Sequence, residues 1–195
     1  DCARAEFLEY GYQKASLRRI CKNANMTTGA VYFFFKDKAD LFDELVKDVA
    51  QCAKDIINET ASLEVQSNNE TQLLETLFSV KLGKDLINLY FDHPDQVKLL
   101  FNLSEGSHFE NFNEILQGYI EKRIRTLVEL KIGKDKTIFT DEMIGWLAHA
   151  ETDGFLYAIH LHSTREQTLN MIESIIAYLI AGFNRLYREE LENNS

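Results

Sequence analysis

The chain has 195 residues, a formal net charge of −10 at pH 7, and one proline beside nine glycines. This length allows one large or two small domains with a sizeable core, and so little proline and glycine disfavours a loop-rich all-β fold. Cys2, Cys21 and Cys52 are too widely spaced to indicate a disulfide scaffold or a zinc site, and we expect Cys21 and Cys52 to be small core residues. No apolar run approaches the length of a membrane span, so we expect a cytoplasmic protein.

Charge is divided unevenly along the chain. Residues 1–47 carry eight Lys and Arg against seven Asp and Glu, whereas the remainder carries 13 against 24. An acidic protein repels nucleic acid overall, but the first segment is close to neutral. The asymmetry fits a DNA-reading head on an acidic body, although a solvated acidic surface accounts for the body equally well.

The first expected helix runs from the start of the chain to about Tyr10 and ends at Gly11. The chain opens inside an apolar helical pattern at Asp1, with no cap before it, so we expect natural residues before this point to complete the helix.

The stretch SLRRICKNANMTTGAVYFFFKDK, which begins at Ser16, predicts two short helices joined by a tight turn and a third helix directly after them. Ser16, Thr27 or Thr28, and Asp37 stand where N-caps are needed. Asn25 stands at the turn, where the left-handed conformation is required. This is the geometry that places a helix in the major groove of DNA. Small residues near the start of its second helix, Gly29 and Ala30, would let a neighbouring backbone come close.

Apolar residues recur at helical spacing through the rest of the chain, so the expected fold class is all-α. Polar stretches at 62–70 and 131–140 are expected to be connections, and the segment Asp92-His93-Pro94 should end one helix and begin another. The expected helices cover about 37–60, 71–91, 95–103, 109–130, 141–162 and 164–192, the last with Thr164 as its cap.

The last two expected helices are apolar around much of their circumference, more than one partner helix could cover. They fill either a single-chain core or a four-helix interface between two copies of the chain. The residues that we expect at such an interface are Phe155, Ile159, Ile172, Ile176, Leu179, Ile180, Phe183 and Tyr187.

The first 50 or so residues resemble the N-terminal domain of TetR/AcrR-type transcriptional repressors. The departures from that pattern are Ala15, Cys21, Asn25 and the run Tyr32-Phe33-Phe34. The resemblance implies a helix-turn-helix domain at 1–47, a helical effector-binding and dimerisation domain at 48–195, and pairing of two copies through the last two helices. The residues that carry it are Ala3, Phe7, Gly11, Tyr12, Ser16, Ile20, Thr27, Gly29, Val31, Tyr32, Phe35, Lys36, Lys38, Leu41 and Leu45.

Several residues of this segment have the chemistry to contact DNA. Arg18 can hold guanine with two hydrogen bonds, and threonine can contact base edges or the thymine methyl group. We expect Phe34 and Phe35 to be core residues instead. The expected DNA contacts are Ser16, Arg18, Thr27, Thr28, Gly29, Tyr32, Phe33, Lys36 and Lys38.

Aromatic residues gather in the middle helices, where they either fill the core or line an effector pocket. Aromatic walls with a few polar tips suit an apolar ligand, and the acidic body keeps a cationic amphiphile among the candidates. The residues that we expect to bind the effector are Phe78, Phe101, Phe109, Phe112, Tyr119, Trp146, His149 and Phe155.

The pattern holds no signal for an enzyme, with no paired acid and base, no phosphate-binding loop and no nucleophile elbow. The histidines lie too far apart to indicate a metal site, and no cofactor is expected. The sequence therefore predicts a homodimeric repressor that a small apolar or amphipathic effector releases from an inverted-repeat DNA operator. The alternatives are control by a protein partner, or a helical small-molecule-binding protein or enzyme without a DNA role.

Overall fold

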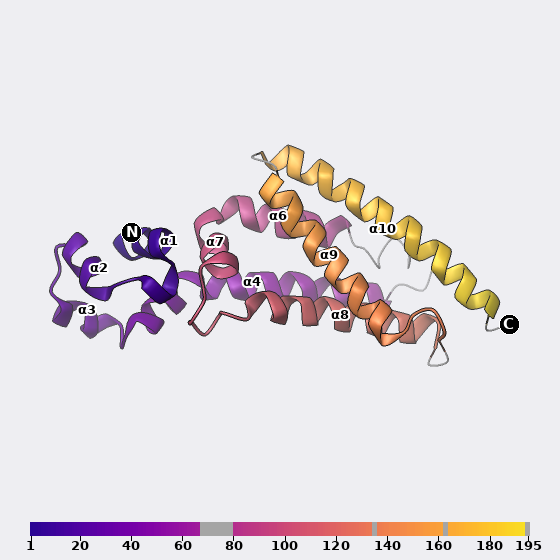
Figure 1. The fold of residues 1–195 in the computed structure, drawn as a ribbon, viewed down its shortest axis with the longest axis horizontal. Helices are drawn as coiled ribbons and strands as arrows, with labels where there is room; N and C mark the ends of the chain where they lie inside the picture. Colours follow the sequence, from indigo (N-terminus) through magenta and orange to yellow (C-terminus); the bar gives the residue numbers. More distant parts are fainter. Residues whose placement is uncertain (67–79, 134–135, 162–163, 194–195) are drawn as a thin grey trace. The chain divides into compact units, whose positions relative to one another are not determined.

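The computed structural model describes residues 1–66, 80–133, 136–161 and 164–193, and in this part of the chain α-helices are joined by turns and loops, without any β-strand (Figure 1). The all-α prediction is confirmed. The helices are α1 (Cys2–Lys14), α2 (Leu17–Asn23), α3 (Thr28–Phe34), α4 (Lys38–Gln66), α6 (Val80–Asp92), α7 (Pro94–Asn102), α8 (Phe112–Lys131), α9 (Asp141–Leu161) and α10 (Arg165–Asn193).

The chain forms two compact units. The first consists of Asp1–Ala53 with Leu89–Ile115, and the second of Lys54–Asn88 with Leu116–Ser195. The helix-turn-helix therefore shares its unit with α7 and the loop after it. The functional boundary after residue 47 stays a prediction.

The predicted helix caps of the first unit are present. Ser16 Oγ, Thr27 Oγ1 and Asp37 Oδ1 each accept a hydrogen bond from the backbone N–H three residues later, at 3.5, 3.2 and 2.9 Å. Asn25 has the expected left-handed conformation, with φ of 53°. These local interactions fix the turn between α2 and α3 and the start of α4.

An aromatic cluster forms the core of the first unit. Phe7 of α1 and Phe42 of α4 are fully buried, and their ring centroids lie 5.0 Å apart in an edge-to-face arrangement. Tyr12 packs on Phe42 at the same centroid distance, and its backbone N–H donates to the carbonyl oxygen of Leu103 at 2.8 Å. This cluster anchors α1 to α4 and to the end of α7.

One helix end agrees with the sequence-based expectation and another differs. The first helical run of α1 breaks at Gly11 as expected, where φ is 69° and ψ is 167°, and a short run after the kink continues to Lys14. The kink is tolerated because glycine has no Cβ to clash in that conformation. Helix α4 extends beyond the expected end near Thr60 to Gln66, so the first part of the expected loop at 62–70 is helical. The rest of that loop, from residue 67, lies outside the described residues.

Cys52 is also not the core residue that the sequence suggested, because it is exposed, whereas Cys21 is buried as expected. On α4, Cys52 lies outside the arc of buried residues that includes Val46, Val49 and Ala53.

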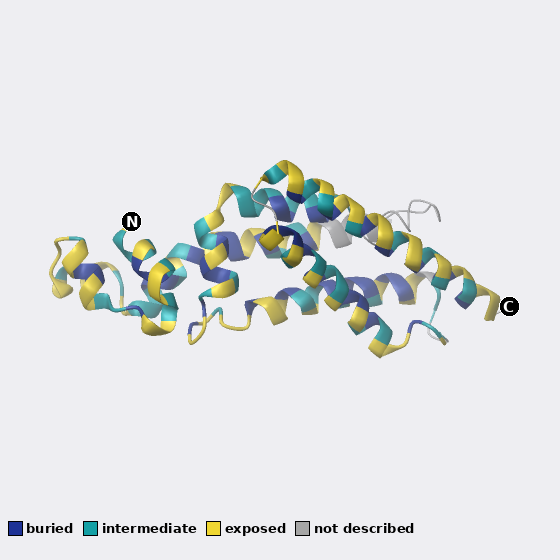
Figure 2. Cartoon of the chain, turned by 45° about the horizontal axis from the view of Figure 1, so that its top comes forward, coloured by how far each residue is buried: buried dark blue, intermediate teal, exposed yellow. Residues whose placement is uncertain are grey.

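Helices α9 and α10 pack side by side in the second unit (Figures 1 and 2). Ile144, Leu147 and Ala148 of α9 are buried, as are Ile172 and Ile176 of α10. The predicted cap of α10 is confirmed, since Thr164 Oγ1 accepts from the backbone N–H three residues later at 3.3 Å.

The far end of α10 is attached to the loop before α9 by a buried carboxylate. Glu190 accepts hydrogen bonds from the backbone N–H groups of Thr137 and Ile138, both at 2.6 Å, and of Phe139 at 3.1 Å. The Thr137 hydroxyl donates a fourth, at 2.9 Å. Burial raises the pKa of Glu190, but these donors outweigh burial and lower it below its ordinary value.

Candidate functional site

A buried carboxylate of α1 positions the start of α2. Glu6 Oε1 accepts from the backbone N–H of Ser16 and from Arg19 Nε, both at 2.8 Å. Arg19 Nη2 also donates to the carbonyl oxygen of Lys14, and its guanidinium lies 4.3 Å from the ring centroid of Tyr10. Burial raises the pKa of Glu6, but the bonds from Arg19 and Ser16 lower it below its ordinary value. Sequence reasoning missed this pair, for which the only signal was an acidic residue inside an apolar helical pattern.

One face of α3 carries most of the expected DNA contacts. At about 100° per residue, Thr28, Gly29, Tyr32 and Phe33 fall within an arc of about 140°. All of them are exposed, Tyr32 at 54% and Phe33 at 84% of its surface. No atom lies within 4 Å of the place that a Cβ on Gly29 would take, so the close backbone neighbour expected at this position is not in the described chain. This face is open for a partner.

Two exposed cations belong to the segments directly before and after α3. Arg18 of α2 and Lys36, just after α3, are exposed, and within the described part of the chain neither side chain has a hydrogen-bond or ion-pair partner. Ser16 is half-buried and serves as the N-cap of α2. Thr27 is exposed and serves as the N-cap of α3. Lys38 is half-buried, because its ammonium donates to backbone carbonyls at the end of α1.

Phe34 is not the core residue that the sequence suggested, since 67% of its surface is exposed. It lies outside the arc and borders an apolar groove of about 300 Å³ in the first unit, together with Ile20, Met26 and Val31. Phe35 is half-buried in the same groove. The chain departs from helical geometry at Phe35, whose φ of −131° is extended.

The family model described as "Bacterial regulatory proteins, tetR family" matches residues 1–45. These residues form a TetR-family helix-turn-helix domain. The match covers α1 to α3 and the start of α4, which are the elements that build the open face.

Curated relatives match stretches of similar length. The HTH-type transcriptional repressor Rv1474c of Mycobacterium tuberculosis is 44% identical over 48 residues, which is 25% of this chain and 26% of that protein. The HTH-type transcriptional regulator AcrR of Shigella flexneri is 47% identical over 45 residues, or 23% of this chain and 21% of that one. The chain thus matches about a quarter of the length of these relatives.

The whole fold also resembles a solved TetR-family structure. The TetR family transcriptional regulator PfmR of Thermus thermophilus superposes with a TM-score of 0.56 over 91% of this chain and 93% of that one. The sequence identity is 13%, so this likeness concerns the fold alone.

The structure does not gather the expected effector-binding residues into one pocket. Phe101, Phe109 and Phe112 belong to the first unit, where Phe112 is buried and its ring centroid lies 5.4 Å from that of Phe101 and 6.4 Å from that of Phe109. The remaining described residues of this set belong to the second unit. Phe78 lies outside the described residues.

Two cavities of the second unit involve members of the expected set. Phe155 lines an apolar cavity of about 30 Å³, to which Glu151 and Thr152 contribute polar side chains. Tyr119 lines a more polar cavity of about 120 Å³. Trp146 is 56% exposed, and His149 is exposed with its Nε2 2.8 Å from the side-chain nitrogen of Gln117.

A buried ion pair, which sequence reasoning missed, connects α8 to α9. Arg123 Nη2 lies 2.8 Å from Glu151 Oε1 and 2.6 Å from Oε2, and only 1% of the Arg123 side chain is exposed. Burial raises the pKa of Glu151 above its ordinary value, although the positive charge of Arg123 acts to lower it. The sequence held no signal for it, because the two residues are far apart along the chain.

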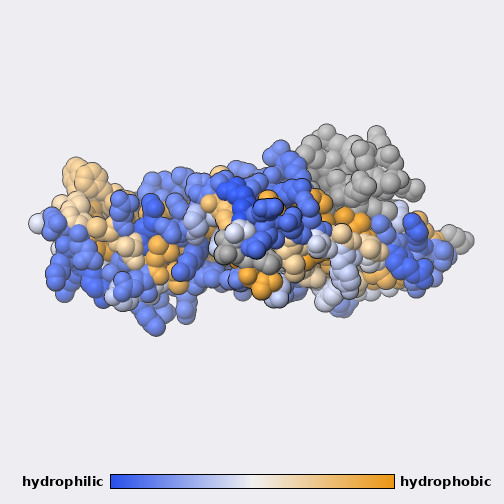
Figure 3. All heavy atoms as spheres, turned by 90° about the horizontal axis from the view of Figure 1, so that it is seen from above, coloured by the Kyte–Doolittle hydropathy of each residue, from blue (hydrophilic) through white to orange (hydrophobic). Residues whose placement is uncertain are grey.

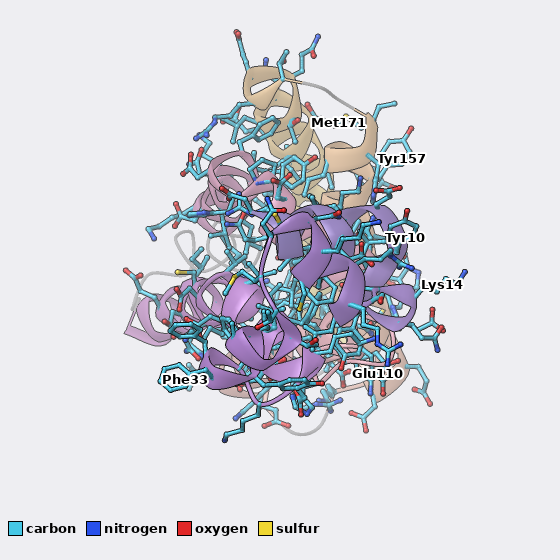
Figure 4. All side chains as sticks on the ribbon, turned by 90° about the vertical axis from the view of Figure 1, so that its left-hand side faces the viewer. Tyr10, Lys14, Phe33, Glu110, Tyr157 and Met171 are labelled. Atoms are coloured by element: carbon cyan, nitrogen blue, oxygen red, sulfur yellow. The ribbon has the colours of Figure 1, made fainter. Side chains whose placement is uncertain are left out.

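The expected dimer residues are already buried within the second unit. Seven of them are buried there, and Ile180 is half-buried. The apolar side chains that α9 and α10 expose are different ones, namely Trp146, Tyr157, Leu161 and Tyr178, each more than half exposed. Figure 4 labels Tyr157 near the edge of the ribbon.

Among the described helices, none is long and apolar enough to cross a bilayer.

Proposed function

We propose that this protein is a homodimeric transcriptional regulator, a repressor that binds an inverted-repeat DNA operator and releases it when a small effector binds. The observation that carries the proposal is the open face of α3 in the TetR-family domain, together with the exposed cations Arg18 and Lys36 on the segments before and after that helix. A helix that exposes polar, small and aromatic side chains beside free cations has the composition of a major-groove reader. Such a protein works where the chromosome is, in the cytoplasm.

The test is selection of bound duplexes from a random DNA pool, followed by titration at several salt concentrations. We expect enrichment of an inverted repeat, because a two-fold dimer presents two identical heads. Arg18→Ala should relax the choice of base at one position of each half-site. Failure to enrich any duplex, by a folded protein, would refute the proposal.

For dimerisation, the exposed apolar side chains of α9 and α10 are a better candidate than the residues expected from sequence. Tyr178 is 77% exposed, and Ala177, Ala181 and Gly182 beside it are exposed too. Small residues with one large aromatic let two helices approach closely, and an exposed apolar patch of this kind marks an interface. The second copy of this chain is the proposed occupant.

For the effector, the apolar cavity lined by Phe155 is the proposed site. Its volume of about 30 Å³ has room for no more than a few water molecules, so a ligand must widen it. The lining of this cavity is mostly apolar and includes Glu151, which is paired with Arg123, so it favours an apolar or amphipathic compound. Such a ligand shifts the protein off DNA only if it prefers the widened state.

The small size of this cavity keeps control by a protein partner as the second candidate. A thermal-shift screen of apolar and cationic compounds, with operator release as the readout, separates the two. Compounds that stabilise the protein and release the operator support effector control, and an absence of such compounds favours a protein partner.

A further inference from the structure

Phe33 is the most exposed large apolar side chain among the described residues, with 84% of its surface accessible. Figure 4 shows it projecting away from the ribbon, and Figure 3 shows hydrophobic side chains gathered at the end that carries the helix-turn-helix. Within the described chain its ring partner is its neighbour Phe34, at a centroid distance of 5.2 Å and nearly perpendicular. The ring therefore contributes nothing to the core of the first unit and is free to meet another molecule.

The position of Phe33 on α3 indicates what kind of molecular surface can approach the ring. Phe33 shares the open face with Thr28, Gly29 and Tyr32, and Gly29 lies four residues earlier, one turn along the helix. No described atom occupies the space within 4 Å of a Cβ built on Gly29. The surface of α3 next to the ring is therefore open, and no side chain of the described chain blocks a flat base edge there.

The surrounding charge fits a polyanion. Arg18 and Lys36 are exposed, and their side chains are without partners in the described part of the chain. An exposed apolar ring on a helix whose neighbouring segments carry exposed cations suits duplex DNA, whose phosphates meet the cations while a groove meets the ring. An uncharged or basic protein surface would leave these cations unmatched.

A phenyl ring has no hydrogen-bond donor or acceptor, which restricts what it can read. Of all the groups that base pairs present in the major groove, only the thymine C5-methyl group is apolar. We propose that Phe33 is a specificity-determining residue that contacts a thymine methyl group, with the open surface at Gly29 leaving room for the base edge. This inference rests on the proposed DNA-binding function.

The test removes the methyl group and nothing else. The duplex selected by the wild-type protein is prepared with each thymine in turn replaced by uracil, and affinity is measured by fluorescence anisotropy with the full chain. At one thymine of each half-site we expect uracil to weaken binding about fourfold, the effect of exposing one methyl group. All other thymines should tolerate the replacement.

Variants assign the effect to the ring. In Phe33→Ala the thymine and uracil duplexes should bind equally, while Phe33→Leu should keep part of the difference. Phe34→Ala is the matched control, because Phe34 is the same residue type on the same helix but lies outside the open face; it should keep the full difference. Circular dichroism checks that each variant is folded. We expect the Phe33 variants to fold, because an exposed side chain contributes little to the core.

The outcomes separate this inference from the function on which it rests. If the protein selects a duplex but binds its thymine and uracil forms equally, or if Phe33→Ala retains the difference, the inference is overturned and the DNA-binding function stands. If no duplex is selected, both are overturned.

Discussion

The ammonium nitrogen of Lys38 lies 2.7 Å from the backbone carbonyl oxygen of Tyr12 and 4.4 Å from the centroid of the Tyr12 ring. It also donates to the carbonyl oxygens of Gln13 at 3.2 Å and Ala15 at 3.3 Å. These three acceptors belong to the end of α1, which has no further helical turn to use them. Burial lowers the pKa of Lys38. Lys38 thus joins α4 to the end of α1, and we expect it to act by positioning the helix-turn-helix and not as a free phosphate contact.

Lys38→Ala should therefore lower the free energy of unfolding by about 1–2 kcal/mol, because it leaves carbonyls without donors. Operator affinity should fall through a displaced α1, but the slope of log affinity against log salt should stay unchanged. Lys36→Ala should show the opposite pattern, with an unchanged melting temperature and a salt slope reduced by about one. Melting curves and salt titrations of both variants measure this. A reduced salt slope in Lys38→Ala with normal stability would instead identify Lys38 as a phosphate contact.

Glu6→Gln should destabilise the first unit by about 2 kcal/mol, because a neutral amide is a weaker acceptor for Ser16 and Arg19. DNA affinity should fall with it, since Glu6 fixes the start of α2. Asp48→Asn, on the exposed side of α4, is the control and should change the free energy of unfolding little. Urea denaturation gives the comparison, and equal midpoints for the two variants would contradict the role of Glu6.

Glu190 should make stability depend on pH. Its pKa is lower in the folded chain than the ordinary 4.5, so its contribution is fully present above that value. The contribution is lost as the pH falls below 4.5 and through the folded pKa. Glu190→Gln should lose about 2–3 kcal/mol at about pH 7 and show a shallower acid transition. Chemical denaturation at a series of pH values above and below 4.5 measures both. A variant that loses stability equally at every pH would contradict this account.

Tyr178→Glu should convert the proposed dimer into folded monomers, because it places a charge in an interface of exposed apolar side chains. Ile176→Glu, two residues earlier, should unfold the second unit instead, since Ile176 is 5% exposed and packed inside the chain. Sedimentation velocity combined with circular dichroism distinguishes these outcomes. A wild-type monomer at micromolar concentration, or a Tyr178→Glu dimer, would refute the interface.

Gly83→Ala should interfere with the apolar cavity of the second unit. A Cβ at this position would stand 2.8 Å from Ile172 Cγ2 and 3.0 Å from Ile176 Cδ1, which both line that cavity. Compounds that shift the melting temperature of the wild type should shift that of the variant less. Gly118→Ala in α8, where a Cβ meets nothing within 4 Å, should bind them normally and be stabilised by up to about 1 kcal/mol. Equal shifts in both variants would place the effector elsewhere.

The helix-turn-helix could be predicted from sequence because its determinants are local. Ser16, Thr27 and Asp37 cap helices through bonds to the backbone three residues on, and Asn25 takes the left-handed turn by itself. Such interactions are visible in a short stretch of sequence, as are the apolar stripes of the longer helices. The interruption of α1 at Gly11 could also be predicted, but the hydrogen bond from the Tyr12 N–H to the carbonyl oxygen of Leu103, a residue far along the chain, could not.

Tertiary structure alone decided which side chains of the apolar helices are inside. Ile172, Ile176 and Phe183 fill the chain's own core, while Trp146, Tyr157 and Tyr178 remain exposed, although all six are large and apolar. Periodicity identifies a buried face but not whether the same chain or a second copy covers it. The pairs Glu6–Arg19, Arg123–Glu151 and Glu190–Thr137 likewise depend on which segments meet, because a carboxylate is tolerated in the interior only where donors from another part of the chain reach it.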